Sequence, residues 1–189
     1  MNVRANPHHD GSPADWVVRH AHLVPPGARV LDVAAGRGRH ARYFAARGAQ
    51  VTAVDRDAEA LREAAGDGIT VRVADLEGQP WPFQPGAFDA VVVVHYLHRP
   101  LLPVIVAALA PGGVLLYETF AQGNEAYGRP HNPDFLLRPG ELLAVTRTMS
   151  VVAFEQGLVQ RTGHSAVMQR VAAVAAGRAW PPLLSAPRG

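Results

Sequence analysis

Cysteine and lysine are both missing from this chain of 189 residues. The lack of cysteine excludes disulfides, thiolate metal ligands and a cysteine nucleophile. The lack of lysine leaves arginine as the strongly basic side chain, and the arginines are scattered from Arg4 to Arg188 without a basic block. A surface that binds nucleic acid normally carries a cluster of positive charge, and the formal net charge here is only +2. We therefore expect no nucleic-acid partner.

Long apolar runs are also missing. The most apolar stretch, residues 101–117, is interrupted by Pro103, Pro111, Gly112 and Gly113, whereas a membrane span needs about 20 apolar residues in an unbroken helix. The N-terminal residues are polar where the apolar core of a secretory signal would lie. We expect a cytoplasmic protein without membrane contact. The length fits a single domain, 1–189, with a loose arm at 1–12 and a tail at 177–189.

Strand-like and helix-like segments alternate along most of the chain. The expected strands lie at 29–33, 50–54, 69–74, 88–94 and 114–119, and the helices between them at 39–47, 57–65 and 99–109. A further helix is expected to begin at the N-cap Ser12. This alternation predicts an α/β fold with a doubly wound, mostly parallel sheet. Two later runs, 151–159 and 166–173, are joined by Arg161, Thr162 and Gly163, which predicts a C-terminal antiparallel β-hairpin and completes a seven-stranded sheet.

A glycine-rich loop follows the first expected strand. Gly36, Gly38 and Ala41 match the dinucleotide-binding pattern G-x-G-x-x-G/A, and Asp55 lies 19 residues beyond Gly36, close to the spacing of a ribose-binding acid. Taken alone, the pattern fits NAD and S-adenosylmethionine equally. Asp32 separates the two, because a carboxylate where the strand meets the loop repels a pyrophosphate and attracts the ammonium and sulfonium groups of S-adenosylmethionine.

Two acids end or follow the next two expected strands. Asp55 ends the second strand and can accept hydrogen bonds from both ribose hydroxyls. Asp75 follows the third strand, where it can accept from an adenine amino group while Leu76 packs on the ring. The carboxyl ends of parallel strands share one edge of the sheet, which is where open α/β sheets bind ligands. The alternative for Asp55 is a surface or capping carboxylate, and the alternative for Asp75 is an acid in a loop.

Together these motifs resemble the class I S-adenosylmethionine-dependent methyltransferases. The resembling segments are 30–48, 51–55, 74–76, 88–90 and 109–113, and the likeness runs from about Pro25 to Phe120 and through the terminal hairpin. It implies a Rossmann-like fold with S-adenosylmethionine as cofactor. One departure is Ala34, which stands where many members have the first glycine. The short length resembles the small tellurite-resistance and thiopurine-type members, which says little about the substrate.

The resemblance also implies a set of cofactor-binding residues. Asp32 and the loop with Gly36 and Gly38 would hold the methionine end, Asp55 the ribose and Asp75 the adenine. The full expected set is Asp32, Ala34, Gly36, Gly38, His40, Asp55, Arg56, Asp75, Leu76 and His95.

The segment after the fourth expected strand faces the transferable methyl group in the resembling family. Because the cofactor brings the electrophile, the protein mainly has to position the acceptor. A general base is needed only when the acceptor carries a proton that must leave. We expect His95 or His98 to act as that base, with Tyr96 shaping the pocket; the alternative is that these rings only pack against the next helix. No metal is expected at the histidines, because the remaining ligands are not evident.

The loop at 121–133 is long for a connection, and such loops often form lids over active sites. We expect it to close over the methyl acceptor, with Gly123 and Gly128 permitting the backbone change. Tyr127, Arg129 and His131 are the expected substrate contacts. A flexible excursion without function is the alternative.

These features favour a methyltransferase that acts on a small molecule. A protein that binds the cofactor or its product without catalysis is an alternative, because the binding motifs are much clearer than the catalytic ones. An NAD-dependent oxidoreductase is less favoured, since Asp32 and the terminal hairpin argue against it. Methylation of RNA or protein would predict a basic groove or an extra domain, and neither is apparent in the sequence.

Overall fold

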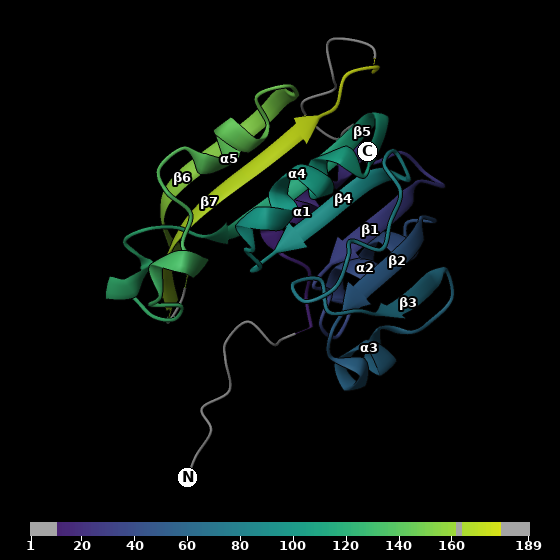
Figure 1. Cartoon of the computed structure of the whole chain (residues 1–189), viewed down its shortest axis with the longest axis horizontal. Helices are drawn as coiled ribbons and strands as arrows, with labels where there is room; N and C mark the ends of the chain where they lie inside the picture. Colours follow the sequence, from purple (N-terminus) through teal and green to yellow (C-terminus); the bar gives the residue numbers. More distant parts are fainter. Residues whose placement is uncertain (1–10, 162–163, 179–189) are drawn as a thin grey trace.

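One mixed sheet of seven strands forms the centre of the protein (Figure 1). In this computed structural model, residues 11–161 and 164–178 are described. The strands are β1 (Arg29–Val33), β2 (Gln50–Asp55), β3 (Ile69–Val73), β4 (Phe88–Val94), β5 (Leu109–Phe120), β6 (Ser150–Arg161) and β7 (His164–Val174). They are ordered β3-β2-β1-β4-β5-β7-β6 across the sheet. The first five run parallel, whereas β7 pairs antiparallel with β5 and β6. The predicted doubly wound sheet with a C-terminal hairpin is confirmed.

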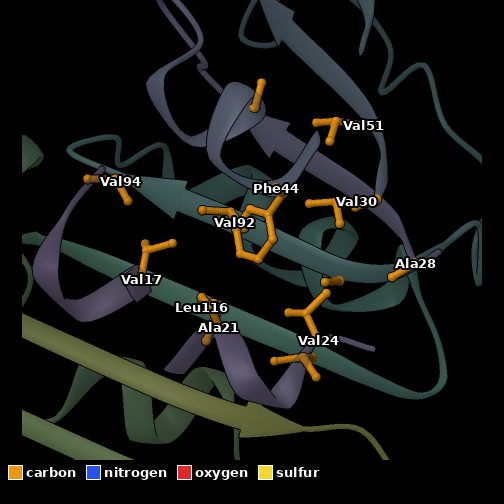
Figure 2. Close-up of a cluster of buried hydrophobic side chains, with 14 of the residues drawn as sticks. Val17, Ala21, Val24, Ala28, Val30, Phe44, Val51, Val92, Val94 and Leu116 are labelled. Atoms are coloured by element: carbon orange, nitrogen blue, oxygen red, sulfur yellow. The ribbon is translucent and has the colours of Figure 1, made fainter. Parts of the chain in front are cut away.

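Helices cover both faces of this sheet. On one face lie α1 (Asp15–His20), α2 (Arg39–Ala45) and α3 (Ala58–Ala64), and on the other lie α4 (Leu102–Ala107) and α5 (Glu141–Val145). Figure 2 shows the first apolar layer, in which Val17 from α1 and Phe44 from α2 lie near Val92 of β4. The neighbouring Val91 and Val93 belong to the layer under α4. Because β4 is covered on both faces, it has no need of polar alternation.

The first helix begins later than predicted. Ser12 is not its N-cap, because α1 begins at Asp15 after Ala14, whose side chain makes no capping bond. The Ala14 N–H instead donates to Nε2 of His40, 3.2 Å away. This bond to a distant residue holds Ala14 in an extended conformation, and no local sequence pattern could predict it. The predicted cap of α3 is present: Asp57 accepts two backbone N–H groups of the first helical turn.

The fifth strand is longer than predicted. The strand expected at 114–119 begins instead at Leu109, which pairs with Phe88 of β4. The register of this pairing shifts between Phe88 and Ala90. The Pro-Gly-Gly turn therefore forms an irregularity within β5 and does not separate the strand from α4. Pairing with the central strand outweighs the local turn signal here.

Several sequence predictions fall at the edges of the described chain. The arm expected at 1–12 and the tail expected at 177–189 lie largely outside the described residues, as do Thr162 and Gly163 of the hairpin link. Among the helices that the structure describes, none is long and apolar enough to span a membrane.

Candidate functional site

The strand order reverses between β1 and β4, which are neighbours in the sheet. The chain leaves β1 toward α2 on one face and leaves β4 toward α4 on the other. Such a switch point opens a crevice at the carboxyl ends of the strands, where α/β proteins bind ligands. A pocket of about 270 Å³ lies at the strand ends and is lined by Ala34, Asp55, Arg56, Ala74, Asp75, Leu76, Glu77 and Tyr96.

The charges of this pocket favour a cationic ligand. Asp55, Asp75 and Glu77 bring three carboxylates, and Arg56 brings the opposing guanidinium. A polyphosphate placed here would meet net repulsion, whereas a sulfonium or ammonium group would be attracted. Glu77 was not among the predicted residues, although its place two residues after Asp75 at a strand end was a usable signal. The structure thus adds a carboxylate to the predicted set.

The glycine loop adopts a strained, left-handed backbone. Ala34 has a φ of 54°, a left-handed conformation that glycine adopts more readily than alanine. Gly36 and Gly38 also have positive φ, at 53° and 73°. The two differ in their surroundings: a Cβ at Gly36 would meet nothing within 4 Å, whereas one at Gly38 would lie 2.3 Å from the Cβ of Ala64. Gly38 therefore permits α3 to approach the loop, and Gly36 is open.

Asp55 ties the end of β2 to this loop. Its Oδ2 accepts from the Gly36 N–H at 2.8 Å, and its Oδ1 accepts from the Asp57 N–H at 2.9 Å. The carboxylate also lines the pocket and is half-buried. Each carboxylate oxygen can accept a second hydrogen bond, so the predicted contact with ribose hydroxyls is compatible with both backbone bonds.

Asp32 and His40 lie behind the loop, away from the pocket lining. The Asp32 carboxylate is buried and accepts from the Ala41 N–H at 3.0 Å. Burial raises the pKa of Asp32 to about 7, so it carries only a partial charge at neutral pH. Burial and the Arg39 charge lower the pKa of His40 to about 3. The neutral His40 accepts from Ala14 at Nε2 and so carries its proton on Nδ1, 3.9 Å from Asp32 Oδ1.

This placement changes the charge argument made from the sequence. The electrostatic preference for a cation over a pyrophosphate rests on the carboxylates that line the pocket. Asp32 instead joins β1 to the first turn of α2. Its predicted contact with the methionine end of the cofactor, and that of His40, stay predictions.

A tight turn presents Asp75 to the pocket. Asp75 Oδ1 accepts from the Glu77 N–H at 3.1 Å, and its carbonyl accepts from the Gln79 N–H at 3.1 Å. A Cβ at Gly78 would lie 2.6 Å from Asp75 Oδ2. The glycine therefore permits the turn to wrap closely around the carboxylate.

Glu77 lies between two of the predicted catalytic residues. Burial and then the neighbouring Glu77 carboxylate, which hydrogen-bonds to Tyr96, raise the pKa of the Tyr96 phenol. Tyr96 is therefore a hydrogen-bond donor at neutral pH and not a base. His98 Nδ1 lies 3.9 Å from Glu77 Oε2. The Tyr96 carbonyl accepts from the buried Tyr117 hydroxyl at 2.9 Å, which anchors this segment on β5.

His95 is held against β5 at the end of β4. It has a φ of 57°, which is uncommon for a residue other than glycine. Its N–H donates to the Glu118 carbonyl at 2.9 Å, and its ring stacks on Phe120 with centroids 4.9 Å apart. Its Nε2 lies 4.0 Å from Oε1 of the buried Glu118 carboxylate. Glu118 was missed from the sequence, although a lone charge inside an apolar strand was a signal.

The loop after β5 is anchored to the sheet through the side chain of Asn124. Asn124 is buried; its Oδ1 accepts from the Val167 N–H at 3.1 Å and its side-chain amide donates to the Gly128 carbonyl. The predicted substrate contacts, Tyr127, Arg129 and His131, are exposed and are not among the residues that line the pocket. Their role stays a prediction.

Comparison with known proteins agrees with this geometry. Residues 30–113 match the family model described as "Methyltransferase domain". The ubiquinone biosynthesis O-methyltransferase of Burkholderia thailandensis is 34% identical over 138 residues, which cover 67% of this chain and 59% of that protein. The chain thus spans less than two thirds of the length of this relative.

Solved structures share the fold at lower identity. TehB from Haemophilus influenzae is 17% identical with a TM-score of 0.67, covering 85% of this chain and 61% of that one. The 1,6-didemethyltoxoflavin-N1-methyltransferase of Burkholderia thailandensis, solved with 1,6-didemethyltoxoflavin and S-adenosylhomocysteine bound, is 24% identical with a TM-score of 0.61, covering 85% of this chain and 76% of that one. From its motifs, its sheet and these matches, the chain belongs to the class I S-adenosylmethionine-dependent methyltransferases.

Proposed function

We propose that this protein transfers the methyl group of S-adenosylmethionine to a hydroxyl group of a small molecule. The observation that carries the proposal is the acidic pocket at the switch point of the sheet, which suits a cationic ligand with a ribose. The choice of an oxygen acceptor is supported by the O-methyltransferase relatives. The scattered arginines, without a basic block, favour a small acceptor over a nucleic acid. The cytoplasmic location stays a prediction.

The residues around the pocket have separate tasks in this proposal. Asp55 would hold the ribose hydroxyls, Asp75 and Leu76 the adenine, and the backbone near Gly36 the methionine end. When bound, S-adenosylmethionine supplies an electrophilic methyl group, whose carbon–sulfur bond breaks as the bond to the acceptor oxygen forms. The acceptor hydroxyl must then lose its proton, and we assign this proton to His95. Tyr96 stays protonated, and its hydrogen bond to Glu77 holds the ring where it can shape the acceptor pocket.

Binding of S-adenosylhomocysteine and NAD tests the cofactor. We expect calorimetry to detect S-adenosylhomocysteine and not NAD at equal concentration, and only the former should raise the melting temperature. D55A should weaken the binding of S-adenosylhomocysteine by about 1.5–3 kcal/mol, because it removes a charged hydrogen-bond acceptor. The matched control is D57A, which removes the cap of α3 and should lower stability by about 1 kcal/mol while leaving affinity unchanged.

The outcomes separate the candidate functions. Binding of NAD instead of S-adenosylhomocysteine would overturn the charge argument and favour an oxidoreductase. Equal loss of affinity in D55A and D57A would move ribose recognition away from Asp55. Binding of S-adenosylhomocysteine without methyl transfer to any of a panel of phenols, alcohols and thiols would favour a cofactor-binding protein without catalysis.

A further inference from the structure

A charged chain of side chains runs from His95 into the antiparallel part of the sheet. Behind the imidazole lies the Glu118 carboxylate on β5, and Glu118 Oε2 lies 2.9 Å from Arg170 Nε on β7. Arg170 Nη1 lies 3.2 Å from Glu155 Oε2 on β6. Glu155 Oε1 accepts from Arg19 of α1 at 2.6 Å, at the surface. Glu118 and Arg170 are each at most 6% exposed at the side chain.

Stability alone is a weak reason for such an arrangement. Removing two charges from water is costly, and buried ion pairs are often no more stabilising than apolar residues of the same size. Here one guanidinium is shared between two carboxylates, Glu118 and Glu155. The half-exposed Glu155 contacts this guanidinium from the outer side, away from His95.

His95 is also restrained by its own backbone and by two contacts with β5. Its left-handed backbone, its N–H bond to the Glu118 carbonyl and its stacking on Phe120 all place the ring against β5. Backbone held in a sparsely populated conformation is often found at functional sites. The outcome of the restraint is that Nε2 is the ring nitrogen that faces Glu118 Oε1.

We propose that Glu118 is a positioning residue, which holds the proton of neutral His95 on Nε2 and so presents Nδ1 as the base for the acceptor hydroxyl. At 4.0 Å the two groups are beyond hydrogen-bond distance, but the negative charge of Glu118 electrostatically favours the tautomer with the proton on the facing nitrogen. It also stabilises the imidazolium that forms when the hydroxyl proton moves to Nδ1. The inference rests on the methyl transfer proposed above, but its physical content can be measured without any substrate.

The test is nitrogen NMR of the histidine rings in the intact protein labelled with ¹⁵N, with His95 assigned by its loss in H95Q. In the unaltered protein we expect neutral His95 to carry its proton on Nε2. In E118Q we expect that preference to weaken and the pKa of His95 to fall by about one unit, since the facing carboxylate is lost and Arg170 stays. His98, which faces Glu77, should keep its spectrum and serves as an internal reference.

E155Q is the matched control. Glu155 contacts the same guanidinium as Glu118 but on the side away from His95. E118Q and E155Q therefore each remove one carboxylate from Arg170, and only E118Q removes the one that faces His95. We expect E155Q to leave the tautomer of His95 unchanged. If E118Q does not fold, the double variant E118Q/R170M removes the buried pair as a unit, and the loss of the Nε2–H preference is still expected.

An unchanged His95 tautomer and pKa in E118Q, or an equal change in E155Q, would overturn the positioning role and leave Glu118 as a structural partner of Arg170. Failure of the unaltered protein to bind S-adenosylhomocysteine would overturn the proposed function instead, without altering these spectra. Once an acceptor is known, E118Q should lower kcat about tenfold or more at neutral pH, with KM little changed.

Discussion

At the scale of single residues, the buried side chains of Asp32 and His40 make the stability of the fold depend on pH in opposite directions. Asp32 has a pKa of about 7 in the folded protein, above its ordinary value of 3.8. Between these two pH values the folded protein keeps a proton on Asp32 that the unfolded chain has released. Its contribution to stability is therefore full at low pH and is lost as the pH rises toward 7. His40 has a folded pKa of about 3, below 6.5. Its contribution is full above pH 6.5 and is lost as the pH falls.

The substitution D32N separates these two effects. Asparagine can still accept from the Ala41 N–H but never has to ionise in the buried site. We expect the free energy of unfolding of D32N, minus that of the unaltered protein, to rise by about 1–3 kcal/mol between pH 5 and pH 8. Urea unfolding at a series of pH values measures this difference. A difference that does not vary with pH would mean that Asp32 keeps one protonation state over the whole range.

At the scale of elements, the glycine loop shows two separate uses of glycine. Gly38 lies against Ala64, so the loop and α3 touch at that point, whereas Gly36 has open space around the position of a Cβ. The sequence pattern treats the two glycines alike. Only the approach of α3 distinguishes a packing glycine from one that leaves room for a ligand.

Alanine at each position tests this distinction. G38A should lower the free energy of unfolding by about 2–4 kcal/mol, because a methyl group in a left-handed backbone must also displace α3. G36A should lower the free energy of unfolding by only about 1–2 kcal/mol, because alanine is strained in a left-handed backbone. It should weaken the binding of S-adenosylhomocysteine at least as strongly as G38A does. Denaturant unfolding and calorimetry supply the two readings. Equal losses of stability would show that α3 shifts freely to accommodate the methyl group.

At the scale of the whole molecule, one arginine fastens the segment after β5 to the rest of the site. Arg99, directly after His98, makes a two-bond contact with the Glu141 carboxylate at 2.8 and 3.0 Å. It also donates to the carbonyls of Asp134 at 2.7 Å and Leu136 at 2.8 Å. The loop is therefore pinned at its second half, and the exposed residues near Arg129 lie in the part between the two anchored ends.

Loosening this anchor should change the dynamics of the loop and not the cofactor pocket. In R99Q we expect hydrogen exchange at residues 133–141 to quicken about tenfold or more, since several charged hydrogen bonds are lost. Affinity for S-adenosylhomocysteine should be unchanged. The matched control is R29Q, which breaks a similar two-bond contact with Asp89 and should leave exchange in the loop unaltered. Unchanged exchange in R99Q would show that packing of the buried Leu136 and Leu137 holds the loop by itself.

The sequence by itself determined the order of the strands along the chain, the glycine loop and the acids that end or follow β2 and β3. These depend on local patterns: apolar runs for strands, glycine where φ is positive, and Asp57 as a helix cap. The resemblance to the methyltransferase family rested on the same local motifs and is confirmed. The seven-stranded sheet followed because alternating strands and helices have few ways to pack.

Only the tertiary structure decided which acids face the pocket and which are buried behind it. Asp32 and Asp55 look alike in the sequence, yet α2 covers the first and the crevice exposes the second. The contacts of Glu118 on β5 bring together His95, which follows β4, and Arg170 on β7. Such contacts depend on sheet order and register, and no local pattern encodes the neighbour that long-range pairing brings alongside a side chain.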